Sequence, residues 1–423
     1  MPGNHSTTLT RHFPVDVIAD IVDHLARDQP SLKSCSLVSR AWVYSARVHL
    51  FSKVYLESDG NDDRCEQYVE LLGDSPHVCA FVRQLVLATS PRRRWYASGT
   101  RITPTLLIGL LTRIPNLHAI EFCGVNFAGA QYQPPMPSAF TMDHITFTDV
   151  GFPGMDTAHD WTRILSVFSS IGHLTVHTEL PHIHHLPPKI TTSFIRISTL
   201  TILGVARPDI MLEFLGQIVI CECLKSLDVM MLTPEHISAF GPFVSTGGIG
   251  AHIRELRLDF TRFRGRQQGH LPKLPSSYWS PLQLGSLSSL HTITLTVWLG
   301  DVASTNFAHV CNILEHAPPN TEIIRIIALG VFRCVVNSND GSEVTLGEFL
   351  REVLIELEEV VWSRFVNVES VVVDLSQTKC SHSGADEDLR KEVKRFFAAA
   401  MPRLNKRSAL QVLTPLCRSC ELP

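Results

Sequence analysis

The sequence predicts an α/β protein in which three short helices precede an irregular solenoid with parallel strands inside and helices outside. Two observations predict this class. A short segment with apolar residues at strand period returns many times along the 423 residues, and stretches with helical apolar spacing lie between its copies. The composition, 44% hydrophobic and 18% charged, is typical of a folded chain. We expect a flexible tail over residues 1–12, the three-helix unit over 13–56 and the repeat array over 57–423.

The three-helix unit starts at Phe13-Pro14, and proline suits the first helical position because it has no N–H to leave unpaired. The first helical pattern extends to Leu25, the second contains Leu32, and the third covers residues 38–50. So small a unit buries too little surface to offset the chain entropy lost on folding. We therefore expect its surplus apolar residues to pack on the rest of the chain or on another protein.

The order of motifs in this unit resembles an F-box. The motifs are Phe13-Pro14, the spaced residues Val17, Ile21 and Leu25, then Leu32, the segment Cys35-Ser36-Leu37-Val38-Ser39-Arg40-Ala41-Trp42, and Leu50-Phe51. Phe13 and Val17 stand where the family commonly has leucine, and Phe51 where it commonly has tryptophan. The resemblance implies docking to the Skp-type linker of a cullin–RING ubiquitin ligase. The residues expected to contact the linker or to hold the helices together are Phe13, Pro14, Val17, Ile18, Ile21, Leu25, Leu32, Leu37, Val38, Trp42 and Leu50. The alternative is an ordinary three-helix cap on a larger domain.

The repeated segment has the form Leu-x-x-Leu-x-Leu. The fourth residues of its eight clear copies are Leu85, Ile120, Ile145, Leu174, Leu200, Leu227, Leu256 and Ile293. Their separations of 25 to 37 residues lie near or above the period of about 20–29 residues in leucine-rich repeats. Stacked units bury a continuous core, with parallel strands on the concave face, which is the usual binding face. The residues expected to point into the concavity include Thr175, Thr201, Asp228, Arg257 and Thr294.

Helices are expected between the strands, and weaker strand copies near the C-terminus. The helical patterns cover residues 65–72, 105–114, 161–168, 210–220, 234–244, 307–316 and 346–365. The weaker strand copies lie at residues 323–326, 368–373 and 410–412. Three long segments rich in proline and glycine are expected to be loops, at residues 126–139, 180–192 and 265–286.

Two basic clusters follow strands and supply candidate substrate-binding residues. The first follows the Leu85 strand and contains Arg92, Arg93, Arg94 and Trp95. The second follows the Leu256 strand and contains Arg262, Arg264 and Arg266. A regular array places both clusters on one rim, and guanidinium groups suit bidentate contact with phosphate or carboxylate. F-box proteins of this architecture often receive phosphorylated or acidic peptides, so we expect an anionic substrate here; two solvated loops are the alternative.

No motif indicates a metal site, a cofactor or catalysis, and we expect none of these. Cys417 and Cys420 form one C-x-x-C pair, whereas the two zinc sites of a RING domain need several such pairs. His182, His184 and His185 have no cysteine or carboxylate at a helpful spacing, which favours a polar loop. A net charge of −4 argues against a nucleic-acid or anionic-membrane partner.

The chain is expected in the cytoplasm or the nucleus. Its eleven scattered cysteines fit a reducing compartment better than a disulfide framework. The N-terminus has no apolar core of a secretory signal, and no uncharged apolar run reaches membrane-spanning length.

The function expected from the resemblance is that of a non-catalytic adaptor: the helices bind the linker, and the array presents a target protein for ubiquitination. The degenerate repeats also resemble those of the large F-box families of mushroom-forming fungi. One alternative is an interaction scaffold without a role in ubiquitination. Another is an enzyme that uses the concave face, against which stands the absence of a nucleophile–base or carboxylate pair at any recognised spacing.

Overall fold

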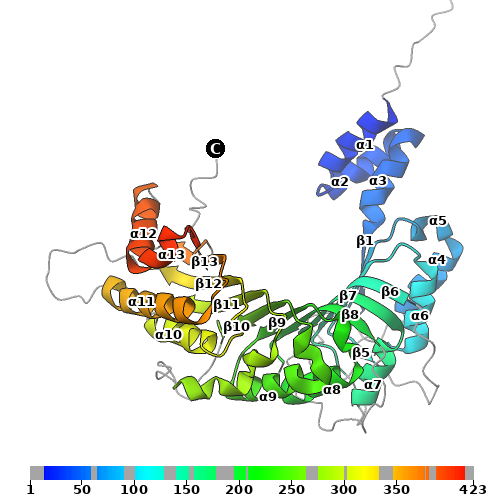
Figure 1. Ribbon diagram of the computed structural model, residues 1–423. Coiled ribbons are helices and arrows are strands. Elements are labelled where there is room, and N and C mark those ends of the chain that lie inside the picture. Colours follow the sequence, from blue (N-terminus) through cyan, green and yellow to red (C-terminus); the bar gives the residue numbers. More distant parts are fainter. Residues whose placement is uncertain are drawn as a thin grey trace, which may run out of the picture. The chain divides into compact units, whose positions relative to one another are not determined.

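The computed structural model describes residues 14–58, 64–89, 101–127, 140–151, 157–177, 195–205, 208–262, 275–299, 303–332, 346–376, 378–380 and 387–414. In these ranges the chain is an α/β protein with parallel strand pairing. The chain divides near Pro153 into two compact units, each of which is described by itself. Figure 1 colours the elements of both units in sequence order.

The first unit begins with the helices α1 (Val15–His24), α2 (Gln29–Val38) and α3 (Arg40–Ser52). Its parallel strands follow in the spatial order β1 (Lys53–Ser58), β2 (Gln84–Thr89), β4 (Ala119–Cys123) and β6 (Phe140–Thr148). The connecting helices are α4 (Arg64–Asp74), α5 (Pro76–Cys79) and α6 (Pro104–Arg113), and β3 (Arg101–Ile102) pairs with β5 (Asn126–Phe127). Three buried rings, Phe122, Phe127 and Phe147, form its aromatic core with centroids 5.1–5.9 Å apart.

The second unit continues the same alternation of strand and helix. Its strands are β7 (Phe168–His177), β8 (Arg196–Leu203), β9 (Ser226–Met230), β10 (Glu255–Asp259), β11 (Thr292–Leu299), β12 (Ile323–Phe332), β13 (Ser370–Asp374) and β15 (Leu410–Leu413), in that spatial order. The short β14 (Thr378–Cys380) also pairs with β12. Its α-helices are α7 (Thr157–Leu165), α8 (Pro208–Ile218), α9 (Pro234–Ser245), α10 (Ala303–Leu314), α11 (Leu346–Arg364), α12 (Glu387–Ala400) and α13 (Pro402–Lys406). Short 3-10 helices are η2 (Cys221–Cys223), η3 (Thr246–Ala251), η4 (Ser276–Tyr278), η5 (Ser280–Leu282) and η6 (Leu284–Ser286).

The register of the strands confirms the repeat pattern that the sequence predicts. In the first unit, Val54, Leu85, Ile120 and Ile145 are partners on successive strands. In the second, the successive partners are Leu174, Leu200, Leu227, Leu256, Ile293, Ile324, Val371 and Leu410. The α/β class and the parallel pairing are therefore confirmed, including the three weaker copies near the C-terminus.

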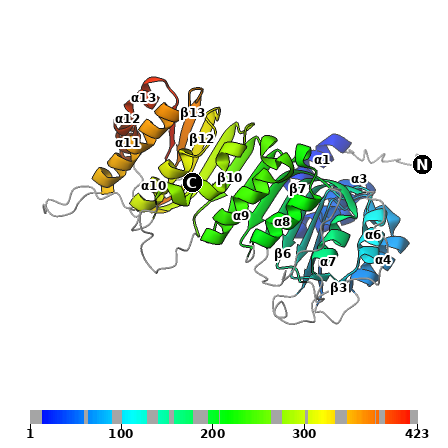
Figure 2. The same cartoon turned by 60° about the horizontal axis from the view of Figure 1, so that its bottom comes forward.

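The strands of the second unit have one face covered by helices and one open face, which is partly exposed at Asp228, Arg257 and Arg325, although Thr296 and Asp374 on this face are buried. Leu227, Val229, Leu256 and Leu258 are buried, whereas the residues that alternate with them are only partly covered. Figures 1 and 2 show α8, α9 and α10 on the same side of these strands. The buried residues therefore face the helices, and residues such as Asp228 and Arg257 lie on the open face.

Three boundaries predicted from the sequence are wrong. The loop expected over residues 126–139 starts inside β5 (Asn126–Phe127). The helix expected over residues 161–168 ends at Leu165, and β7 begins at Phe168. The loop expected over residues 265–286 contains three 3-10 helices in its second half, and Trp279 is buried there. Phe168 is buried as the first residue of β7, and Trp279 is buried in a segment whose serine- and proline-rich composition predicts a loop.

Close packing between α9 and η5 depends on Gly241. A Cβ atom at this position would lie well inside van der Waals contact with the carbonyl oxygen of Pro281. Backbone at such a distance cannot move aside as a flexible side chain would, so only glycine fits.

We expect Gly241→Ala to lower the free energy of unfolding by about 1–3 kcal/mol, because overpacking forces the backbone apart. Gly285→Ala is the matched control: an added Cβ there meets no atom within 4 Å, and its effect should stay within about 0.5 kcal/mol. Urea denaturation of both variants is the measurement. Equal stability of the two would contradict the packing described here.

Candidate functional site

The N-terminal helices enclose a very small core. Ile18 and Val22 of α1 and Leu32 of α2 are buried together, and three partly buried side chains, Leu25, Trp42 and Leu50, pack against them. These side chains hold the helices together, and a core of this size leaves much of the helices' apolar surface uncovered.

Local polar contacts fix how the three helices start and meet. Pro14 accepts the first helical hydrogen bond of α1 from the Ile18 N–H at 3.1 Å. The Asp28 carboxylate caps α2 by accepting bonds from the Ser31 hydroxyl at 2.6 Å and the Ser31 N–H at 3.3 Å, which lowers the pKa of Asp28. Asp23 and His49 join α1 to α3 with 2.7 Å between Oδ1 and Nε2.

Large apolar side chains of these helices remain exposed. Leu37 and Val38 at the end of α2 are 86% and 66% exposed, and Val17 and Ile21, one turn apart on α1, are 39% and 38% exposed. Two further exposed residues, Val15 and Tyr44, were not identified from the sequence. We call Val15, Val17, Ile21, Leu37, Val38 and Tyr44 the exposed apolar set.

The structure thus separates residues that the sequence pattern left together. Ile18, Leu25, Leu32, Trp42 and Leu50 belong to the small core, whereas Val17, Ile21, Leu37, Val38 and the exposed Pro14 face outward. Phe13 lies outside the described residues. The outward-facing group, with Val15 and Tyr44, has the most side-chain surface available to a second protein.

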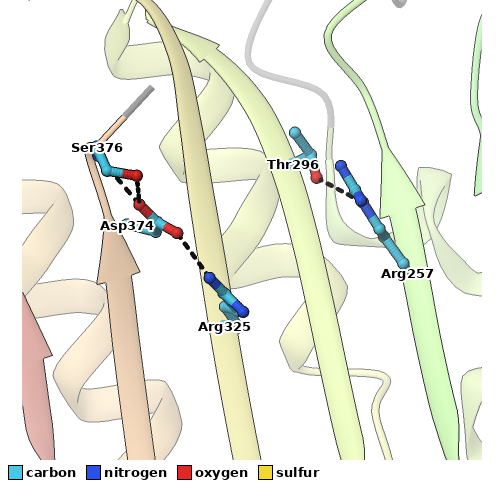
Figure 3. Close-up of polar contacts among 5 residues, drawn as sticks. All are labelled: Arg257, Thr296, Arg325, Asp374 and Ser376. Carbon is cyan, nitrogen blue, oxygen red and sulfur yellow. Dashed lines mark hydrogen bonds and ion pairs between the residues drawn. The ribbon is translucent and has the colours of Figure 1, made fainter. Parts of the chain in front are cut away.

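A second candidate surface is the polar row on the open face of the second unit. Asp228, Arg257, Thr294 and Arg325 are partners in register across β9, β10, β11 and β12. Arg257 donates from Nε to the hydroxyl of Thr296 at 3.3 Å (Figure 3). Its Nη1 lies 3.9 Å from Oδ2 of Asp228. Burial raises the pKa of Asp228, and the nearby Arg257 offsets this only in part.

Arg325 belongs to a tighter cluster in this row. Its Nη2 donates to Oδ2 of Asp374 at 2.7 Å, and Oδ1 of Asp374 accepts bonds from the Ser376 hydroxyl at 2.5 Å and the Ser376 N–H at 3.0 Å. Figure 3 shows this chain of contacts from β12 to the end of β13. Burial raises the pKa of Asp374, but the bonds from Ser376 and Arg325 outweigh it and lower the pKa overall. Asp374 and Ser376 were not singled out from the sequence.

Of the seven residues in the two predicted basic clusters, one lies in the described part of the chain. Arg262 is exposed in the turn after β10, whereas Arg92, Arg93, Arg94, Trp95, Arg264 and Arg266 lie outside the described residues. The same is true of the histidines at 182, 184 and 185 and the cysteines at 417 and 420.

The described residues contain no metal cluster, and three of their cysteines, Cys65, Cys79 and Cys311, are buried. The structure places no group of three metal-ligating side chains together in the ranges it describes. Burial raises the pKa of Cys65 to about 11, and burial also raises that of Cys79. Every helix in the described part of the chain is too short or too polar to cross a membrane.

No protein-family model matches the sequence, and no curated protein matches it. Functional proposals for this chain rest on its own residues and their geometry.

We expect Leu32→Ala to destabilise the N-terminal helices by about 2–5 kcal/mol, because it opens a cavity in a core too small to close around it. Leu37→Ala removes a side chain of the same kind from the surface and should change stability by no more than about 0.5 kcal/mol. Hydrogen exchange of α1–α3 in the full chain measures both. Equal exchange in the two variants would show that Leu32 and Leu37 do not differ as core and surface.

Asp374→Asn should lower the free energy of unfolding at pH 7 by about 1–3 kcal/mol, because the carboxylate loses its charge-assisted bonds. The pKa of Asp374 in the folded protein is lowered from 3.8. The difference in the free energy of unfolding between wild type and variant is therefore fully present above about pH 4, and it is lost as the pH falls through the folded pKa. Urea titrations at pH 7 and at pH 3 measure this difference. Glu369→Gln, at an exposed carboxylate, is the control, and an advantage that stayed constant with pH would contradict the assignment.

Proposed function

We propose that this chain is the substrate-recognition adaptor of a cullin–RING ubiquitin ligase, with an F-box over residues 13–56 that binds the Skp-type linker. The exposed apolar set is the observation that carries the proposal. These side chains lie on three helices whose own core consists of a few residues. Exposed apolar surface of this kind is expected where a partner protein packs.

The order of motifs along these helices supports the choice of partner. Pro14 at the start of α1, the core residue Leu32 and the partly buried Trp42 occupy positions of the F-box pattern. The exposed Leu37 and Val38 fall in its central motif. We infer that the core residues set the angles between the helices and that the exposed apolar set contacts the linker.

The remaining chain suits a recognition role. Parallel strands with leucine or isoleucine in register form a stacked array, for which we propose a leucine-rich-repeat-like architecture. No side chain of this protein then needs to do chemistry. The adaptor acts by holding a target lysine near a conjugating enzyme, which raises its effective concentration. The arginines at 92–94, 262, 264 and 266, with Trp95, stay proposed contacts for an anionic target.

The test is co-purification of the full chain with a Skp-type linker. We expect the double variant Leu37→Ser/Val38→Ser to bind the linker at least about tenfold more weakly than the wild type, because a few residues at the centre of an interface carry most of the binding energy. Its thermal midpoint should be unchanged because both side chains are exposed in the free protein.

Val366→Ser is the matched control, since Val366 is 80% exposed but lies outside the N-terminal helices; it should bind like the wild type. Wild-type protein that fails to bind any Skp-type linker would overturn the proposal. Recovery of the linker without a cullin would instead favour an interaction scaffold with no role in ubiquitination.

A further inference from the structure

The open face of the second unit presents two arginines in the same orientation. Arg257 on β10 and Arg325 on β12 are in register with Thr294 on β11 between them. Neighbouring strands lie about 4.8 Å apart, so the two backbones are about 10 Å apart. Their side chains are 42% and 44% exposed. In Figure 3 each guanidinium leans toward the next strand of the sheet.

Each arginine is oriented by a partner on that next strand. Thr296, which is fully buried, accepts a bond from Nε of Arg257. Asp374, which is 3% exposed, accepts a bond from Arg325 and is itself fixed by the hydroxyl and the N–H of Ser376. Side chains fixed in this way lose little further freedom when they bind a ligand.

The two guanidinium groups use few of their donors within the protein. A guanidinium has five N–H groups. Among the described residues one N–H of Arg257 and one of Arg325 donate hydrogen bonds to side chains, and Nη1 of Arg257 also lies 3.9 Å from a carboxylate oxygen of Asp228. Nε of Arg325 is buried without a hydrogen-bond partner in the described part of the chain. Because this nitrogen is buried, a ligand would use the other N–H groups of the two side chains, which are 42% and 44% exposed.

We propose that this face binds an extended peptide through two anionic side chains about 10 Å apart, one on Arg257 and one on Arg325. An oxyanion with two oxygens matches the planar fork of a guanidinium, and both carboxylate and phosphate have this chemistry. A peptide in the extended polyproline II conformation rises about 3.1 Å per residue and turns once in three residues, so side chains three residues apart lie about 10 Å apart on the same side. Trp298, 47% exposed and two residues beyond Thr296 on the same strand face, offers an aromatic surface further along β11.

The role of this face as the target-binding site of an adaptor rests on the proposed function, whereas peptide binding itself does not require the linker. Peptide binding and the adaptor role can therefore be disproved separately. A chain that binds the linker but no anionic peptide loses only the present inference. A chain that binds such peptides but no linker keeps it and loses the adaptor role.

The experiment uses the full chain without a linker and fluorescent Gly/Ser peptides that carry two aspartates, two phosphothreonines or two glutamines, three residues apart. Fluorescence anisotropy measures binding. We expect both anionic peptides to bind and the glutamine peptide to bind at least about tenfold more weakly. The tighter of the two anionic peptides identifies carboxylate or phosphate as the preferred group.

Arg257→Gln and Arg325→Gln should each weaken binding about tenfold or more, and Arg254→Gln, at an exposed arginine before β10, should not. Thr294→Glu is the variant that removes no existing hydrogen bond: its carboxylate would lie between the two arginines and compete with the peptide. Arg325→Lys should keep the pairing with Asp374 and the thermal midpoint but lose the bidentate contact and hence affinity. Equal binding of the glutamine peptide, wild-type affinity in Thr294→Glu, or no binding of any anionic peptide would overturn the inference.

Discussion

The fold depends on keeping each parallel strand in register with its neighbours. No single strand and helix of this chain can bury its apolar side alone, so each leucine or isoleucine on the covered face must meet its counterparts on adjacent strands. A shift of one residue would turn this row outward and bring Arg257 or Arg325 into the core. The same register therefore builds the hydrophobic core and lines up the polar residues of the open face, so the array's stability and its candidate binding row have one origin.

The N-terminal helices follow a different principle. They share a core of a few side chains, with Ile18, Val22 and Leu32 fully covered, and leave Leu37 and Val38 in solvent. A cluster of this size contributes little stability, and the exposed apolar side chains contribute none in the free protein. Binding of a second protein would raise the stability of the helices, because it would cover the exposed side chains and order the helices that carry them. In this account the protein has one surface for an apolar partner and another for an anionic one, on separate units of the chain.

Much of the fold follows from the sequence because periodicity is a local property. The alternation around Leu227 or Leu256 is visible in six residues, and the helices expected near residues 105–114, 234–244 and 346–365 are present as α6, α9 and α11. Contacts between distant segments were not predictable in the same way. Arg325 and Asp374 are 49 residues apart and meet only because β12 and β13 are neighbours, and Trp279 is buried although its segment is rich in serine and proline. Leu32 and Leu37 are five residues apart on α2 and so lie about 140° apart around its axis; packing against α1 and α3 decides that the face with Leu32 is the covered one.

The central claim is that the exposed apolar side chains of α1–α3 are the binding surface for a Skp-type linker. Hydrogen exchange of the full chain, measured by mass spectrometry with and without a saturating amount of linker, tests it most directly. The account predicts slower exchange on linker addition in peptides from residues 15–52, with exchange in β9–β13 unchanged. Unaltered exchange in residues 15–52, or protection confined to the strands, would contradict it.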